Sequence, residues 1–283
     1  MPQPVKLGVL KIGCIGSVPL IEYLLDERAE RSDIITRTIG TGAKMDPQQS
    51  EDAAMQLMEF KPDLAVVASP NATLEGPKVA RETLAKANIP TVVISDIPAR
   101  KIAKDLEQMG FGYIINEADA MIGARREFLD PTEVAIYNAD ILKVLAVTGI
   151  IPLLVKLLDQ LITSIKSDEK PLLPHLIVTR DRALSEAALT NPYARAKATA
   201  AFEIARSISN TNIEACFLLH EWEQYTTLVA SAHEMMRAAA KLADEAREIE
   251  KGTDAVVRRP HARDGTPMHK TRLIEKPASN KET

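Results

Sequence analysis

Residues that could bind an anion or stabilise a charge gather where short apolar segments end. Glycine amides at the start of a helix bind anionic groups, and a nearby lysine strengthens the attraction. Ordinary turns and helix caps use the same residue types, so one such loop alone indicates little. Four loops at one edge of a sheet favour a ligand site. The residues are Lys11, Gly13, Gly16 and Ser17; Thr41, Gly42 and Lys44; Ser69 and Asn71; and Ser95, Asp96 and Pro98.

The first of these loops has the spacing Gly-x-x-Gly, from Gly13 to Gly16, and lacks the Gly-x-Gly-x-x-Gly fingerprint of dinucleotide-binding folds. The second apolar segment ends at Gly40 without the acidic residue that would hold an adenosine ribose. No Gly-Lys-Ser/Thr sequence follows the glycines, which argues against a P-loop nucleotide. The pattern permits an anionic cofactor that has no adenosine ribose.

Other chemically able residues give weaker signals. The histidines lack metal-ligand spacing, and His233-Glu234 lacks the second histidine of a zinc protease motif. His233 is therefore either structural or adjacent to the substrate. Cys14 and Ser231 have no evident base beside them, so nucleophilic catalysis is not supported. Arg125, Arg126 and Glu127 form either a solvated charge cluster or an ion-pair cluster at an interface. No metal site is predicted.

The first 130 residues alternate apolar strand-like segments with helical periodicity, which predicts an α/β fold. We expect a Rossmann-like parallel sheet with helices on both faces and right-handed crossovers. The predicted strands are Val5–Ile12, Ile34–Ile39, Leu64–Ala68, Thr91–Ile94 and Gly112–Ile115. The predicted helices follow Ser17 through Leu24 and then cover Pro47–Phe60, Pro77–Ala87 and the region of Ile102–Met109.

The pattern changes after Asp130-Pro131, so we predict two domains, residues 1–130 and residues 131–283. The second is expected to be smaller and helical, with a short C-terminal β-hairpin. Its predicted helices are Thr132–Val147, Pro152–Ile165, Pro192–Ser207 and Leu228–Lys251. Short strands are expected at Leu176–Thr179 and Ile213–Leu219, and Asp264-Gly265 marks the turn of the hairpin.

Composition narrows the class of protein. The 283 residues are 46% apolar and 26% charged, as in soluble globular proteins. A net charge of -4 argues against a general nucleic-acid binder. No apolar run approaches the ~20 residues that cross a bilayer, and no secretion signal is visible. Two cysteines, Cys14 and Cys216, fit a reducing cytoplasm. We expect a cytoplasmic protein that binds neither membrane nor nucleic acid.

Several longer segments resemble the F420-dependent methylenetetrahydromethanopterin dehydrogenase family. The resemblance is most specific over Asp119–Asp140 and extends in blocks from Lys11 to Leu273. Further matching blocks are Leu24–Ala29, Asn191–Ala194, Val229–Arg237 and Asp254–His261. The resemblance implies an archaeal oxidoreductase, a homohexamer, coenzyme F420 as hydride carrier and a tetrahydromethanopterin-type substrate. It also implies a place in methanogenic, or reverse-methanogenic, one-carbon metabolism.

Two loops depart from the family pattern. Where the family usually has Asn-Pro-x-x-Pro-Gly-Pro, this chain has Asn71-Ala-Thr-Leu-Glu-Gly-Pro77. Where the family usually has Gly-Asp-Ala-Pro-Gly, it has Ser95-Asp-Ile-Pro-Ala99. These changes leave two alternatives open, a non-catalytic pterin-binding paralogue and an NADP-linked methylene-pterin dehydrogenase.

The implied reaction needs no general base, because removal of a hydride from the methylene bridge leaves a methenyl cation. The protein must align donor and acceptor, exclude water and place negative charge near the cation. Asp96, Asp119 and Glu127 are the candidates for that charge. The anionic tail of the coenzyme suits the cofactor-binding loops, and Arg125, Arg126 and His233 are assigned to the substrate.

Overall fold

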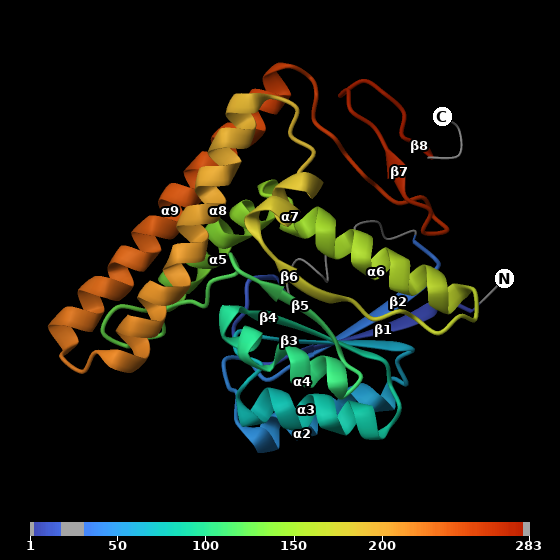
Figure 1. Ribbon diagram of the computed structural model, residues 1–283, viewed down its shortest axis with the longest axis horizontal. Helices are drawn as coiled ribbons and strands as arrows, with labels where there is room; N and C mark the ends of the chain where they lie inside the picture. The colour runs from blue at the N-terminus through green and yellow to red at the C-terminus, as the bar shows by residue number, and fades with distance from the viewer. Residues whose placement is uncertain (1–2, 18–30, 280–283) are drawn as a thin grey trace.

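The computed structural model describes residues 3–17 and 31–279, and its centre is a parallel sheet (Figure 1). The six strands lie in the order β2-β1-β3-β4-β5-β6. The first five strands were predicted within two residues, and the sixth is shifted by one residue from the predicted Leu176–Thr179 segment. The strands are β1 (Val5–Lys11), β2 (Ile34–Gly40), β3 (Leu64–Ser69), β4 (Thr91–Asp96), β5 (Gly112–Asn116) and β6 (His175–Val178).

One face of the sheet is covered by α2 (Pro47–Glu59), α3 (Glu75–Lys86) and α4 (Ala103–Gln108) (Figure 1). The Asp46 side chain caps α2 by accepting a hydrogen bond from the Gln49 amide at 3.0 Å. A short 3-10 helix, η1 (Ile97–Ile102), joins β4 to α4. The helix expected to follow Ser17 falls almost wholly outside the described residues.

The other face is covered by α5 (Pro131–Val147) and α6 (Ile150–Lys166), whose apolar side chains share one core with the strands. Gly149 separates the two helices at a φ of 92°. A Cβ at this position would lie 2.0 Å from the Ala183 carbonyl oxygen, so only glycine fits the bend. Among the described residues no single helix is long and apolar enough to span a bilayer, although α5 and α6 pass that test as a pair bent by 69°.

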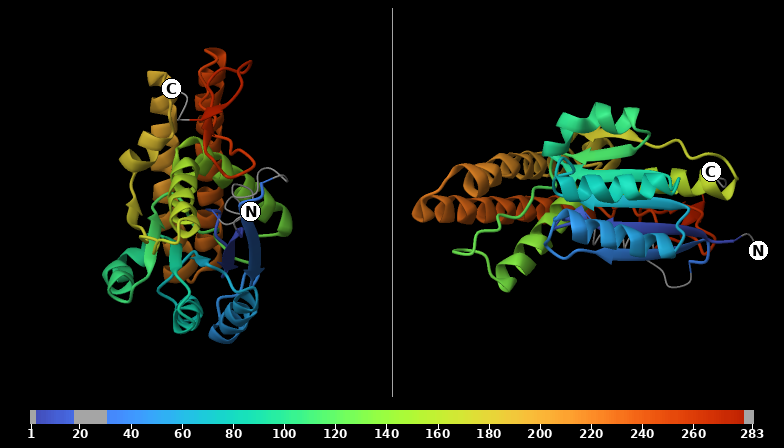
Figure 2. Two further views of the ribbon diagram at one scale, coloured as in Figure 1. Left: turned by 90° about the vertical axis from the view of Figure 1, so that its right-hand side faces the viewer. Right: turned by 90° about the horizontal axis from the view of Figure 1, so that it is seen from below.

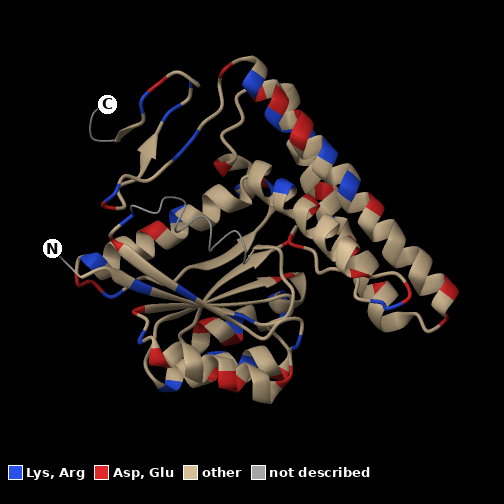
Figure 3. Cartoon of the chain, turned by 180° about the vertical axis from the view of Figure 1, so that it is seen from behind, with Lys and Arg blue, Asp and Glu red and all other residues tan. Residues whose placement is uncertain are grey.

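A long antiparallel pair of helices, α8 (Pro192–Ile213) and α9 (Trp222–Gly252), extends beyond the sheet (Figure 2). Charged residues of both signs lie along the pair and are densest toward the end away from the α8–α9 turn (Figure 3). The strand predicted at Ile213–Leu219 is wrong, because Glu214–Leu218 form a single π-helical turn between α8 and α9. A short apolar run does not distinguish a strand from a helix end by periodicity.

The C-terminal hairpin is confirmed. Antiparallel bridges join Arg258 to Lys270 and His261 to Pro267, across the predicted Asp264-Gly265 turn. Two short strands, β7 (Met268–His269) and β8 (Ala278–Ser279), pair beyond it. The domain boundary at residue 130 remains a prediction, and β6, from the second half of the chain, completes the sheet of the first half.

Candidate functional site

A row of buried polar residues crosses the carboxyl ends of three neighbouring strands. The parallel register pairs Ser69 with Ser95 and Asp96 with Asn116. Ser69, Asp96 and Asn116 are 0%, 2% and 1% exposed. The Ser69 hydroxyl and the Asn116 amide nitrogen have no hydrogen-bond partner among the described residues. Buried polar groups without partners are rare, so these two atoms mark a place where a ligand or water is expected.

Asp96 ends β4 and accepts hydrogen bonds from η1, from α8 and from the Met121 amide. Its carboxylate accepts a hydrogen bond from the Ile97 amide at 2.6 Å, and the Ser209 hydroxyl of α8 donates to both oxygens at 3.0 and 3.2 Å. Burial raises the pKa of Asp96 to about 8, and the nearby charge of Asp119 adds to the rise. Pro98 follows in η1 and is half-buried. The centre of the row is therefore a carboxyl that has no close cation among the described residues.

Asp119 lies on the segment after β5 and is 1% exposed. It accepts hydrogen bonds from the Gly16 amide at 3.1 Å and the Ser17 amide at 3.0 Å. Burial raises the pKa of Asp119, whereas these hydrogen bonds act in the opposite direction. The two amides that the sequence suggested for an anionic ligand thus donate to a carboxylate of the chain itself. A Cβ on Gly16 would lie 2.8 Å from the Asp119 oxygen, so the approach requires glycine.

The ends of β1 and β2 are joined by a lysine. Lys11 Nζ donates to the carbonyl oxygens of Gly13 and Gly42 at 2.9 and 3.0 Å. The Gly13 amide donates to the Thr41 hydroxyl at 3.2 Å, and that hydroxyl donates to the Lys44 carbonyl at 2.5 Å. Lys44 itself is exposed. The structure brings these five predicted residues together, and two of them, Lys11 and Lys44, carry a positive charge.

The loop after β3 is closed by its own side chains. The Asn71 amide oxygen accepts hydrogen bonds from the Thr73 amide at 3.1 Å and the Thr73 hydroxyl at 2.6 Å. Arg81 NH1 donates to the Ala72 carbonyl at 2.9 Å. Ser95 Oγ accepts a hydrogen bond from the Ala72 amide at 3.0 Å, which links this loop to the end of β4. Asn71 therefore shapes the loop in addition to any contact with a ligand.

Two residues that the sequence did not single out hold the segment after Asp119. Tyr137 of α5 donates its hydroxyl hydrogen to the Ala120 carbonyl at 3.0 Å. The Asn212 amide of α8 donates to the Met121 carbonyl. Asn212 lies one turn after Ser209 on the same helix, so α8 contacts both Asp96 and this segment. The spacing of a serine and an asparagine at i and i+3 is the only sequence signal for this face, and it is weak.

His233 lies beside this cluster. Its ring meets Phe128 edge-on at 4.8 Å and Tyr137 at 4.7 Å between centroids, and Nδ1 lies 3.5 Å from a Glu133 oxygen. Burial lowers the pKa of His233, although Glu133 opposes the shift. Its Nε2 atom is buried without a partner among the described residues. Burial therefore favours the neutral ring, one nitrogen of which has no hydrogen-bond partner among the described residues.

Comparison of the sequence with known proteins identifies the family of this chain. The family model described as methylene-5,6,7,8-tetrahydromethanopterin dehydrogenase matches residues 5–278. The chain belongs to this family. It is 54% identical to the F420-dependent methylenetetrahydromethanopterin dehydrogenase of Archaeoglobus fulgidus, over 96% of this chain and 99% of the relative. The enzyme of the same name from Methanocaldococcus jannaschii is 47% identical, over 96% of this chain and 99% of the relative.

A solved structure is similar over nearly the whole chain. It is described as F420 dependent methylene-tetrahydromethanopterin dehydrogenase in complex with methylene-tetrahydromethanopterin and coenzyme F420. The match covers 97% of this chain and 100% of that one, with a TM-score of 0.93 and 47% sequence identity. This chain is therefore similar, in fold and in sequence, to a protein whose structure contains both methylene-tetrahydromethanopterin and coenzyme F420.

The most specific family segment, Asp119–Asp140, includes a structural arginine. Arg125 donates to the Ala215 carbonyl at 2.8 and 3.1 Å and to the Leu219 carbonyl at 3.0 Å, and its guanidinium lies 4.0 Å from the Tyr225 ring centre. Arg126 and Glu127 are less buried than the strand-end acids and lie on the same loop. Arg125 therefore fixes the π-helical turn between α8 and α9. Glu127 is exposed, whereas Asp96 and Asp119 are buried.

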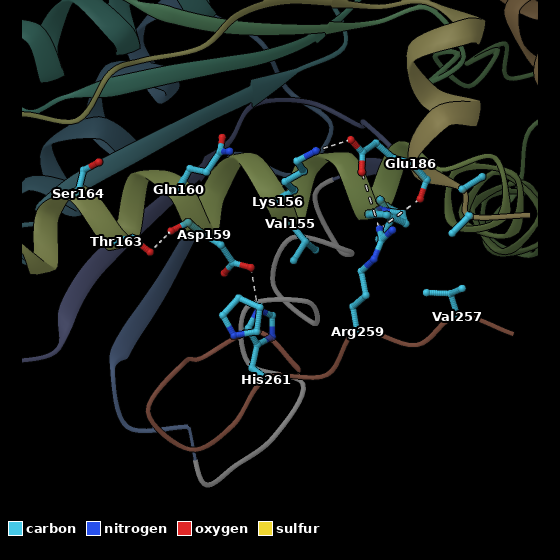
Figure 4. Close-up of a pocket in the computed structure, with 15 residues that line it drawn as sticks. Val155, Lys156, Asp159, Gln160, Thr163, Ser164, Glu186, Val257, Arg259 and His261 are labelled. Atoms are coloured by element: carbon cyan, nitrogen blue, oxygen red, sulfur yellow. Dashed lines mark hydrogen bonds and ion pairs between the residues drawn. The ribbon is translucent and has the colours of Figure 1, made fainter. Parts of the chain in front are cut away.

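A cavity of about 760 Å³ lies away from the strand ends, between α6 and the C-terminal segment that follows α9 (Figure 4). Its charged lining residues pair with one another, Lys156 with Glu186 at 2.6 Å and His261 with Asp159 at 2.8 Å. None of the residues predicted for the site lines it. Within residues 3–17 and 31–279, no group of three or more metal-ligating side chains is arranged to hold a metal ion. The strand ends remain the candidate site of this family member.

Proposed function

We propose that this chain catalyses reversible hydride transfer between methylenetetrahydromethanopterin and coenzyme F420. The observation that carries the proposal is the match, at 47% identity and a TM-score of 0.93, to a dehydrogenase in complex with both compounds. The buried row of Ser69, Asp96 and Asn116 supports it, because this hydride transfer needs oriented polar groups and does not require a nucleophile or a metal.

The chain's residues fit an anionic coenzyme without an adenosine ribose. β2 ends at Gly40 and is followed by a threonine rather than an acid. Lys11 and Lys44 supply positive charge, and the loops of Gly13 and Thr41 are tied together beside them. The coenzyme, when bound, supplies the ring that accepts the hydride. We assign its tail to eight of the residues named from the sequence: Lys11, Gly13, Thr41, Gly42, Lys44, Ser69, Asn71 and Pro98. Gly16 and Ser17 are withdrawn from that role, because their amides donate to Asp119.

Removal of the hydride creates a cation on the pterin, and the buried acids are suited to stabilise it. Asp96 and Asp119 lie together at the strand ends with α8 behind them, and a low-dielectric surround strengthens their effect. Glu127, on the exposed loop, remains a further candidate for the charge that stabilises the cation. For the substrate we retain Arg126 and His233, whereas Arg125 acts mainly by fixing the α8–α9 turn.

We further propose that the protein is a cytoplasmic homohexamer in methanogenic or reverse-methanogenic one-carbon metabolism. The family resemblance supports the hexamer. Exposed apolar side chains at the α8–α9 turn also support an assembly: Phe217, Leu218 and Trp222 are 65%, 65% and 57% exposed. Light scattering at micromolar protein should give a mass six times that of the chain, and a monomer would contradict the proposal.

An absorbance assay tests the reaction itself. Methylenetetrahydromethanopterin is mixed with the protein and either oxidised F420 or NADP, and both coenzymes are followed by their absorbance. We expect turnover with F420 and none with NADP or NAD. Turnover with NADP alone would favour an NADP-linked enzyme. Pterin binding without turnover by either coenzyme would favour a non-catalytic paralogue.

A further inference from the structure

Among the described residues, the surroundings of Asp96 contain polar groups and another acid but no free cation. The flanking strand ends carry Ser69 and Asn116, which do not titrate, and the buried acid Asp119 is near enough to raise the pKa of Asp96. Tyr137 of α5 carries a phenol whose pKa burial raises well above its ordinary value, so it stays neutral. Ser209 of α8 contacts the carboxyl directly.

The arginines of η1 and α8 on this side of the molecule pair with another carboxylate. Arg100 of η1 pairs with Glu117 at 2.9 Å, and Arg206 of α8 approaches the same carboxylate at 3.8 Å. His233 of α9 lies against Tyr137 and is held neutral by burial, which lowers its pKa. Within the part of the chain that the structure describes, therefore, no positive charge compensates an ionised Asp96. Two buried acids that interact electrostatically without a cation cannot both ionise without a large cost in free energy.

We propose that Asp96 is a neutral acid until the pterin binds, and that it releases its proton when the cationic methenyl form occupies the strand ends. The exchange balances, because one proton leaves the carboxyl for solvent as one positive charge enters the site. Asp96 then acts as the counter-ion of the product and carries no charge opposite the neutral methylene form. This inference rests on the proposed function, since it takes the pterin as the ligand.

Three further observations support the exchange. The unpartnered polar atoms of Ser69 and Asn116 flank Asp96, which is where a ligand is expected. The Ser209 hydroxyl can accept a hydrogen bond from the protonated acid or donate one to the carboxylate, so it serves both states. Burial raises the pKa of Asp96 to about 8, so the acid is protonated at neutral pH. A cation bound beside it would lower this pKa and release the proton.

The test is calorimetric titration of the protein with methenyl- and methylene-tetrahydromethanopterin, without coenzyme. The two pterins differ by one hydride and therefore by one charge. Titration at pH 6.5 in buffers of different ionisation enthalpy gives the number of protons released on binding. We expect the methenyl form to release about one proton per subunit and the methylene form none, with the release fading as the pH rises through about 8.

Single-residue variants show which side chain releases the proton. Asp96→Asn should still bind the methylene form, release no proton and bind the methenyl form at least about tenfold more weakly. Asp119→Asn should retain the release. Ser209→Ala removes a hydrogen bond that favours the charged form, so the release should persist to higher pH. Asp244→Asn, which removes an exposed carboxylate paired with Lys143, is the matched control and should behave as the wild type.

The outcomes separate the two proposals. Binding of the methenyl form to the wild type without proton release at pH 6.5 would overturn the exchange and leave the proposed function intact. Release that survives in Asp96→Asn but is lost in Asp119→Asn would also overturn it, because the proton would belong to the other acid. Failure of both pterins to bind would count against the proposed function itself.

Discussion

The Ala72 amide donates a hydrogen bond of 3.0 Å to Ser95 Oγ, and both residues depart from the family pattern. The family resemblance implies proline at the first position and glycine at the second. Proline has no amide hydrogen and glycine has no hydroxyl, so the usual pair cannot form this bond. The two altered loops therefore compensate each other, since this contact links the end of β4 to the loop after β3.

This coupling predicts non-additive effects on stability. Ser95→Gly leaves the buried Ala72 amide without a partner, which should lower the free energy of unfolding by about 1–3 kcal/mol. Ala72→Pro removes the donor. The double variant restores the family pair and should lose at least about 0.5 kcal/mol less than the sum of the single changes. Urea denaturation of the four proteins measures the coupling, and strictly additive losses would show that the contact carries no energy.

The raised pKa of Asp96 predicts how stability changes with pH. In the unfolded chain the carboxyl ionises near its ordinary pKa of about 3.9, whereas in the folded protein it ionises at about 8. Between these values the folded state binds a proton that the unfolded state lacks. The contribution to stability is therefore greatest below pH 4 and is lost as the pH rises to 8.

Melting curves of the wild type and Asp96→Asn check this sign. Asparagine does not titrate, so the variant should gain stability relative to the wild type as the pH rises from 5 to about 8 and then show a constant difference. The comparison cancels the titration of other groups. A difference in melting temperature that is independent of pH would contradict the raised pKa.

The sheet could be predicted from the sequence because each strand is a short apolar run followed by turn residues. The carboxyl ends of parallel strands meet at one edge, so residue order alone was enough to place Ser69 and Asp96 at a common edge. The π-helical turn at Glu214–Leu218 could not be predicted, because its carbonyls are satisfied by Arg125, some ninety residues earlier in the chain. The local pattern of apolar residues does not reveal a contact between residues so far apart in the chain.

The site was harder to predict than the fold. Ser209 and Asn212 are unremarkable in a long polar helix, and only the packing of α8 against the strand ends gives them partners. The Gly16 and Ser17 amides were expected to bind a ligand, yet Asp119, more than a hundred residues later, accepts their hydrogen bonds. Tertiary contacts of this kind decide which polar groups are still available to a ligand.

Arg125 and Arg126 are adjacent in sequence but should differ in what they support. Arg125→Ala leaves the Ala215 and Leu219 carbonyls without their donor and should lower the free energy of unfolding by about 1–3 kcal/mol. Arg126→Ala is the matched control, because that side chain is exposed and should change stability by less than about 0.5 kcal/mol. Equal losses in thermal or urea unfolding would remove the structural role from Arg125.

The last prediction concerns which acid stabilises the developing cation. Asp96→Asn keeps the shape of the side chain and can still accept the Ile97 amide hydrogen, so the fold should persist. The asparagine cannot ionise to become the counter-ion of the methenyl cation, and removal of one oriented electrostatic contact typically slows turnover by about 10²–10³. Glu127→Gln removes the charge of an exposed carboxylate, which solvent screens, and should slow turnover by less than about tenfold. Single-turnover reduction of the deazaflavin, measured beside a thermal melt, distinguishes the two. An unchanged rate in Asp96→Asn, with a large loss in Glu127→Gln, would move the stabilising charge to the exposed loop.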